Sequence, residues 1–170
     1  VSSLLHLQED YVDDIVTQQV LAESQTRINA MILLHSQLYQ NDVIDLIDLE
    51  ELFLAIIESV AATFGVKHFE ARCELEGENV DPDLATSMGV IFNELVINSF
   101  KHVNYESYPT IEVTSIKHGE VITMTYTDYG KFNYGAVFET PEKKGFGLKL
   151  IDMLLFQIDG KLHYSFDEYA

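Results

Sequence analysis

The sequence predicts an α+β fold, in which a helical hairpin precedes a mixed sheet that carries helices on one face. Three observations predict it. Apolar residues recur at helical spacing over the first 41 residues, later segments alternate between helical and β-rich patterns, and the resulting order is αα followed by αβαββαβ. The chain has 170 residues, of which 47% are hydrophobic, so it can bury a core without disulfides.

Residues 1–44 are predicted to form the hairpin. Apolar positions keep helical spacing over residues 1–16 and 28–39, and the turn is expected at 17–19 or 23–26. One hairpin cannot bury two such narrow stripes alone. Two hairpins in a four-helix bundle can, which predicts a homodimer, and the alternative is packing on the rest of the same chain.

Residues 45–170 are predicted to form a second domain. Its first helix begins near Asp48, which stands at capping-box spacing from Glu51, and ends at Gly65. Then follow, in order, a strand at 67–75, a polar connection at 76–82, a strongly apolar helix at 83–101, a hairpin of strands at 110–117 and 121–128, a loop at 129–144, a helix at 147–158 and a strand at 161–166.

Charge and cysteine content exclude several classes of protein. The chain has 28 acidic and 10 basic residues, a formal net charge of −18, which argues against partners such as nucleic acid or a membrane surface. No apolar run approaches the roughly 18–20 residues of a membrane span. The lone Cys73 excludes a disulfide framework and fits a reducing, cytoplasmic compartment. Because Val1 is not Met, we expect a piece of a longer protein.

Four lysines fall within 19 residues of this acidic chain: Lys131, Lys143, Lys144 and Lys149. Such a local cationic stretch suggests a small anionic ligand. Ordinary solubilising lysines on a loop explain it equally well.

The apolar helix at 83–101 carries unexpected polar residues near its end. Glu94 and Asn98 are four residues apart and share a helix face, and Lys101 lies close to that face. A carboxylate and a carboxamide at this spacing can hold a hydrated magnesium ion. Glu94 can alternatively accept a proton or orient an attacking group. The competing interpretation is a solvated polar helix face.

Two glycine motifs follow. Asp128 closes a strand and precedes Gly130 by two residues, an arrangement suited to an exocyclic amine such as that of adenine. Gly145 and Gly147 open a helix, where free backbone N–H groups can meet phosphate. Each motif is weak evidence alone, because both also occur in ordinary turns.

Together these motifs resemble the GHKL ATPase fold and, more narrowly, the catalytic domain of sensor histidine kinases. Residues 93–102 match the N box of that family, 128–130 its G1 box and 145–148 its G2 box. The N box has the form of the subgroup with Asn-Glu-Leu-Val-x-Asn-Ala-x-Lys-His. Residues 1–8 and 27–39 resemble that subgroup's dimerisation and phosphotransfer hairpin, so the resemblance spans nearly the whole chain.

The resemblance implies catalytic roles for the N-box residues. Asn98 would coordinate magnesium, Asn93 or Glu94 would help to hold the ion or the attacking group, and Lys101 would reach a phosphate. His102 would contact phosphate, or it would cap the end of the helix.

The resemblance also implies a nucleotide site around the glycine motifs. Asp128 would bind the adenine amine, with Gly130 beside the ring. The lid over the triphosphate would be closed by the G2-box residues and assisted by the neighbouring lysines, namely Lys143, Lys144, Gly145, Gly147 and Leu148.

Three features depart from the family pattern. The acceptor histidine is expected upstream of Val1, and neither His6 nor the apolar-face His35 replaces it. Phe132 takes the place of the second glycine in Asp-x-Gly-x-Gly, where it either crowds the nucleotide or reshapes the lid. The chain stops at Ala170, where the family usually adds another strand.

We therefore expect the C-terminal part of a two-component sensor histidine kinase. It would bind Mg-ATP, phosphorylate a histidine and pass the phosphoryl group to an aspartate of a response-regulator receiver domain. Phe132 favours an alternative, a degenerate GHKL domain that acts as a non-catalytic phosphotransfer or dimeric scaffold. A serine kinase of the anti-sigma type is a third possibility, against which the helical hairpin argues.

Overall fold

The computed structural model describes residues 46–75, 79–119, 121–132 and 146–165, together with Ser24, Ile28 and Ile32. The hairpin predicted for residues 1–44 otherwise lies outside the described residues. Ser24, Ile28 and Ile32 are all helical, which fits the predicted helical spacing. The sequence left two positions for the turn of the hairpin, 17–19 and 23–26. Ser24 is helical, so the prediction of a turn at 23–26 is wrong.

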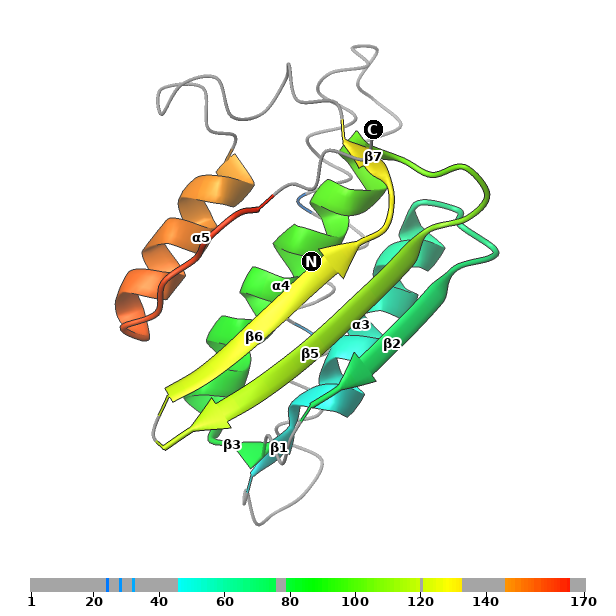
Figure 1. Cartoon of the computed structure of the whole chain (residues 1–170). Helices are drawn as coiled ribbons and strands as arrows, with labels where there is room; N and C mark the ends of the chain where they lie inside the picture. Colours follow the sequence, from blue (N-terminus) through cyan, green and yellow to red (C-terminus); the bar gives the residue numbers. More distant parts are fainter. Residues whose placement is uncertain are drawn as a thin grey trace.

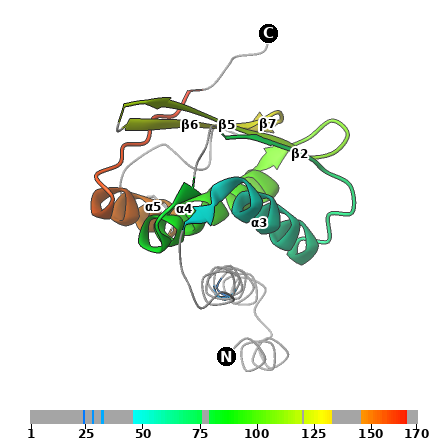
Figure 2. The same ribbon diagram turned by 90° about the horizontal axis from the view of Figure 1, so that it is seen from below.

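A three-stranded mixed sheet forms one layer, and helices cover one of its faces (Figures 1 and 2). The strand order is β2-β5-β6, with bounds Glu70–Glu74, Thr110–His118 and Val121–Asp128. Strand β2 runs parallel to β5, and β6 runs antiparallel to it. The helices are α3 (Leu49–Thr63), α4 (Pro82–His102) and α5 (Phe146–Gln157). The predicted α+β fold, with its mixed sheet and one-sided helices, is confirmed.

Short polar side chains fix where the two central helices begin. The Asp48 carboxylate accepts hydrogen bonds from the backbone N–H groups of Glu50 and Glu51, at 2.9 and 3.2 Å, and caps α3. Asp81 caps α4 in the same way, and Pro82 follows in its first turn. The chain leaves α3 through Gly65, whose φ of +67° favours glycine.

Two short ladders were not predicted. Strands β1 (Ile47–Asp48) and β3 (Asn79–Val80) pair antiparallel just before α3 and α4, so the two helices begin side by side. Strand β4 (Val103–Asn104) directly follows α4 and pairs with β7 (Lys131–Phe132), inside the segment predicted as loop. Two-residue strands show no periodicity, so hydrophobic patterns cannot reveal them.

Two other strand predictions need correction. Residues 161–165 form no strand, although we predicted one at 161–166. A strand exists only through hydrogen bonds to a neighbour, and within the described ranges the sheet ends at β6. Strand β2 is also shorter than the predicted 67–75, because its register with β5 begins at Glu70.

The core lies between the sheet and the helices. The Phe92 ring of α4 stacks on Phe53 of α3, with centroids 4.0 Å apart, and meets the Tyr126 ring of β6 edge-on at 5.7 Å. Fully buried aliphatic side chains surround this aromatic column, including Leu49, Leu52, Ile56, Ile57, Val96, Ile97 and Ile111. Within the described segments, no helix is both long and apolar enough to cross a membrane.

Candidate functional site

A chain of hydroxyl groups joins the end of α4 to the end of β6. The Ser99 hydroxyl donates to Asp128 Oδ2 at 2.6 Å and also bonds to the Tyr126 hydroxyl at 2.7 Å. An ionised carboxylate carries no proton, so the single Ser99 proton goes to Asp128 and Tyr126 donates to Ser99. One carboxylate oxygen of Asp128 is thus held from α4, and Ser99 does not occupy the other.

Burial sets the electrostatics of this cluster. It raises the pKa of Asp128, and the hydrogen bond from Ser99 opposes that rise. The pKa of Tyr126 is raised first by burial and then by the negative charge of Asp128, and the same two causes raise the pKa of Tyr105. Both tyrosines therefore keep their protons and remain hydrogen-bond donors at neutral pH.

Gly130 packs too tightly for any side chain. A Cβ atom there would lie 2.1 Å from Val103 Cγ1 and 2.9 Å from Tyr105 Cδ1. The next two residues pair with β4, Phe132 opposite Val103, and the exposed Lys131 ammonium lies 2.9 Å from Glu106 Oε1. The chain that leaves Asp128 is thereby held against the end of α4.

The predicted N-box residues lie along the second half of α4 but differ in exposure. Asn93 and Glu94 are each 1% exposed, whereas Asn98 and His102 are half-buried and Lys101 is exposed. The side-chain amide of Asn93 makes no hydrogen bond with any described residue. Glu94, Lys101 and His102 each have an interaction partner. The accessible polar groups of the predicted N box are thus confined to the last turn and a half of α4.

The donors on this face fit a magnesium ion that keeps most of its waters. The described residues contain no group of three or more His, Cys, Asp or Glu side chains that could hold a metal. Mg²⁺ commonly binds to only one or two protein oxygens, with waters and substrate phosphates completing its shell. Asn98, half-buried one turn beyond Glu94, offers such an oxygen.

The predicted G2-box residues are only partly described. Gly147 and Leu148 lie in the first turn of α5 and are buried, and α5 packs against α4. Lys143, Lys144 and Gly145 lie outside the described residues. The structure therefore brings Asp128, Gly130 and the N-box helix together and leaves the position of the predicted lid open.

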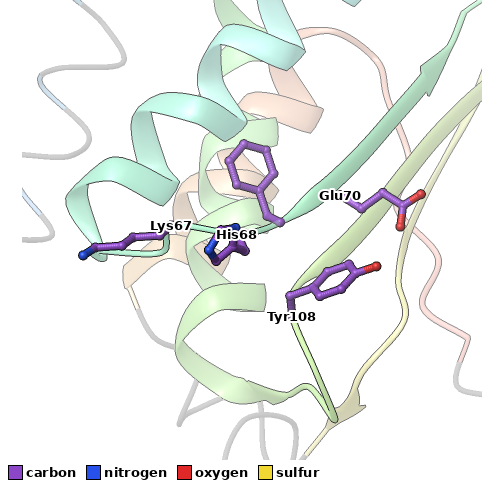
Figure 3. A pocket seen from close by; sticks show the side chains of 5 residues that line it. Lys67, His68, Glu70 and Tyr108 are labelled. Carbon is purple, nitrogen blue, oxygen red and sulfur yellow. The ribbon is translucent and has the colours of Figure 1, made fainter.

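A separate cavity of about 490 Å³ opens on the other side of β5 (Figure 3). Its lining comes from the start of β2 and the segments before β2 and β5: Lys67, His68, Phe69, Glu70 and Tyr108. In the sheet register, Glu70 pairs with Thr110, whereas Asp128 pairs with Ile111 from the opposite side. None of the predicted site residues lines this cavity.

Sequence reasoning missed the hydroxyl groups around Asp128. Ser99 directly follows Asn98 in the predicted N box, and Tyr126 lies two residues before Asp128, on the same face of β6. The two-residue period of a strand could have indicated Tyr126. No sequence signal indicates Tyr105, because only the tertiary fold brings it to Gly130.

Comparison with known proteins gives one family and a shared fold. Residues 1–64 match the family model HisKA_2, described as histidine kinase. The histidine kinase domain of the Erythrobacter litoralis EL346 blue-light activated histidine kinase superposes with a TM-score of 0.65 at 15% identity, over 93% of this chain and 84% of that one.

Two further structures extend the comparison. This chain spans 54% of a longer EL346 chain, again with a TM-score of 0.65 and 15% identity over 93% of this chain. The Acinetobacter baumannii histidine kinase AdeS aligns with a TM-score of 0.51 at 16% identity, over 96% of this chain and 87% of that one. At these identities the likeness shows the fold alone. No curated protein sequence matches.

Proposed function

We propose that this chain, whose residues 1–64 match the histidine kinase family model, is part of a two-component sensor histidine kinase, and that it binds Mg-ATP and donates the phosphoryl group. One observation carries the proposal. The Asp128 carboxylate stands at the end of β6, held through Ser99 by the N-box helix, beside a glycine that tolerates no Cβ. An acceptor with close backbone access suits the exocyclic amine of adenine.

The groups proposed for the phosphates lie on α4, next to the proposed base site. Asn98 would hold a magnesium ion with Glu94 or Asn93 behind it, and Lys101 and His102 would face phosphate oxygens. Magnesium, when bound, neutralises charge on the transferring phosphoryl group. The negative end of the helix dipole also stabilises the positive charge of Lys101 in the last turn of α4. Lys143, Lys144, Gly145, Gly147 and Leu148 would close over the triphosphate.

Further partners follow from the family. We propose that residues 1–44 form a hairpin that dimerises as half of a four-helix bundle, and that residues 45–170 bind the nucleotide. The phosphoryl group would pass to a histidine, and from there to an aspartate of a response-regulator receiver domain. Because these steps use cytoplasmic ATP, we place this region in the cytoplasm.

Calorimetric titration of the chain with Mg-ATP tests the proposed site. We expect micromolar binding that is lost in Asn98→Ala and in Asp128→Ala. Asn104→Ala and Asp83→Ala serve as matched controls, because both residues are exposed and lie outside the site. If the folded chain binds no Mg-ATP, the proposal fails and the non-catalytic scaffold, favoured by the pairing of Phe132 with β4, takes its place.

Transfer chemistry is tested separately with ATP labelled on its γ-phosphate. We propose neither His6 nor His35 as the acceptor histidine, so we expect no acid-labile, base-stable label on these 170 residues. Stable labelling of that kind would show that a histidine within the chain is the acceptor, which would contradict the expectation.

A further inference from the structure

The Tyr105 hydroxyl is the least explained polar group near Asp128. It is buried and has no hydrogen-bond partner among the described residues. The charge of Asp128 raises the pKa of Tyr105 and the neighbouring Ser99 hydroxyl lowers it, which places the Tyr105 hydroxyl in the same cluster. Its ring lies against Gly130, where a Cβ would meet Tyr105 Cδ1 and Cε1 at 2.9 and 3.0 Å. The ring is thus fixed by packing, whereas no group in the described part of the chain, the nearby Ser99 included, meets the hydroxyl at hydrogen-bond geometry.

Buried hydroxyl groups are nearly always paired, so an unpaired one in a candidate binding site indicates an atom supplied by a ligand. Tyr105 offers a proton, because its raised pKa keeps it neutral. Asp128 would offer its second carboxylate oxygen, which the Ser99 hydrogen bond does not use. The cluster therefore presents one donor and one acceptor to the same ligand.

This pair of groups matches one kind of purine edge. Adenine carries an amine that donates and, beside it, a ring nitrogen that accepts. Guanine carries a carbonyl oxygen in place of that amine, and the oxygen would face the Asp128 carboxylate as a second acceptor. A carboxylate next to a hydroxyl donor is thus complementary to adenine and mismatched to guanine.

We propose that Tyr105 is a base-recognition residue that donates to a ring nitrogen of adenine, and that Ser99 positions Asp128 to accept the adjacent amine. The inference rests on the proposed nucleotide site and adds the groups that would set its base selectivity. Tyr126 would act behind Ser99, by donating to its hydroxyl and so directing the Ser99 proton toward Asp128.

Competitive titration of the whole chain with Mg-ATP and Mg-GTP tests the role of Tyr105. The unchanged chain should prefer ATP, and Tyr105→Phe should weaken ATP binding about fivefold to tenfold while GTP binding changes little. Tyr108→Phe is the matched control, because it removes an exposed hydroxyl that lines the separate cavity. An unchanged ATP-to-GTP ratio in Tyr105→Phe overturns the inference and leaves the proposed function standing. Absence of binding in the unchanged chain overturns both.

A second measurement has its main readout on the unchanged chain. ATP analogues in which C–H replaces one ring nitrogen beside the amine should bind the unchanged chain about fivefold to tenfold more weakly for one of the two nitrogens. In Tyr105→Phe that penalty should disappear, because hydroxyl and nitrogen form one interaction. If both analogues bind as tightly as ATP, Tyr105 does not contact the base.

The positioning role of Ser99 has its own signature. ATP binding should weaken as pH falls and Asp128 is protonated, and Ser99→Ala should move the midpoint to higher pH because it removes the hydrogen bond that lowers the pKa of Asp128. The titratable groups that face Asp128 are Tyr126 on β6 and Tyr105 beyond β4, and neither ionises in acid. Titration of the ATP phosphates affects the unchanged chain and Ser99→Ala equally. An unmoved midpoint would contradict the positioning role.

Discussion

The two halves of α4 make the same kind of contact with the sheet through opposite chemistry. In the middle of α4, the Phe92 ring packs between the rings of Phe53 and Tyr126, and the ring contacts are apolar. At the other end, Ser99 meets Asp128 through a hydrogen bond of 2.6 Å. The same Tyr126 side chain serves both regions, its ring in the apolar column and its hydroxyl in the polar cluster.

The difference shows how one helix serves stability and binding at once. Apolar contacts are non-directional and fix where α4 lies against the sheet. The polar cluster retains acceptor and donor capacity that the fold itself does not use. Disrupting the first region should therefore mainly lower the stability of the fold, and disrupting the second should mainly change what the protein binds. Four substitutions test that division.

The largest effect is expected at the apolar end. Phe92→Ala should lower the free energy of unfolding by about 3–5 kcal/mol, because it leaves a cavity between two aromatic rings. Urea unfolding measures this as a lower midpoint with an unchanged slope. Phe156→Ala is the control. Phe156 is 87% exposed, so its removal should change stability by no more than about 0.5 kcal/mol. Similar losses in both variants would show that the aromatic column is not the core.

The next effect joins both regions. Gly130→Ala should cost about 1–3 kcal/mol, because the new methyl group overlaps Val103 Cγ1 and something must move. It should also weaken Mg-ATP binding, since Asp128 lies two residues away. Adding Val103→Ala should recover part of both losses by removing the overlapping atom. The double variant must be more stable than Gly130→Ala for this account to hold.

The third substitution should stabilise the protein and abolish binding. Burial raises the pKa of Asp128, so the folded state holds its proton more tightly than the unfolded state does. Ionisation of Asp128 thus opposes folding as pH rises from the ordinary carboxyl pKa of about 4 through the raised one. Asp128→Asn keeps an oxygen for Ser99 and carries no charge.

Its melting temperature should exceed that of the unchanged chain by a few degrees at neutral pH, and the difference should vanish below about pH 4. Mg-ATP binding should be lost at every pH. Asp83→Asn, on an exposed residue, should not show the pH-dependent gain. A lower melting temperature for Asp128→Asn would mean that the charge supports the fold rather than the site.

The smallest effect concerns the ion pair beside the β4–β7 ladder. Lys131 and Glu106 lie 2.9 Å apart, but their side chains are 78% and 82% exposed. Solvent and salt screen such pairs, so Lys131→Ala should leave thermal unfolding unchanged within error. A clear, salt-dependent fall in melting temperature would show that the ion pair, and not the ladder with Gly130 packing, holds this segment.

The sequence predicted most of the helices and long strands, but it missed the two short ladders and the hydroxyl groups around Asp128. Helix α4 lies within one residue of its predicted bounds, because apolar periodicity and a polar cap define it. The same patterns do not reveal two-residue ladders, which depend on partners far away in the sequence. They also wrongly predicted a strand at 161–166, since β-forming residues need a neighbour to pair with.

The candidate site divides in the same way. Motifs indicated Asp128, Gly130 and the N-box residues, because spacing along one element is visible in sequence. The contribution of Tyr105 was not visible. It depends on how the segment after β4 folds onto Gly130, more than twenty residues further along the chain.

The central claim is that nucleotide binds where α4 meets the end of β6. Backbone amide chemical shifts of the whole chain, recorded with and without Mg-ATP, test it most directly. We predict the largest changes at Ser99 and at Asp128–Gly130, and little change at the Lys67–Glu70 edge of the separate cavity. Changes centred on that cavity, with Ser99 and Asp128 unaffected, would contradict the account.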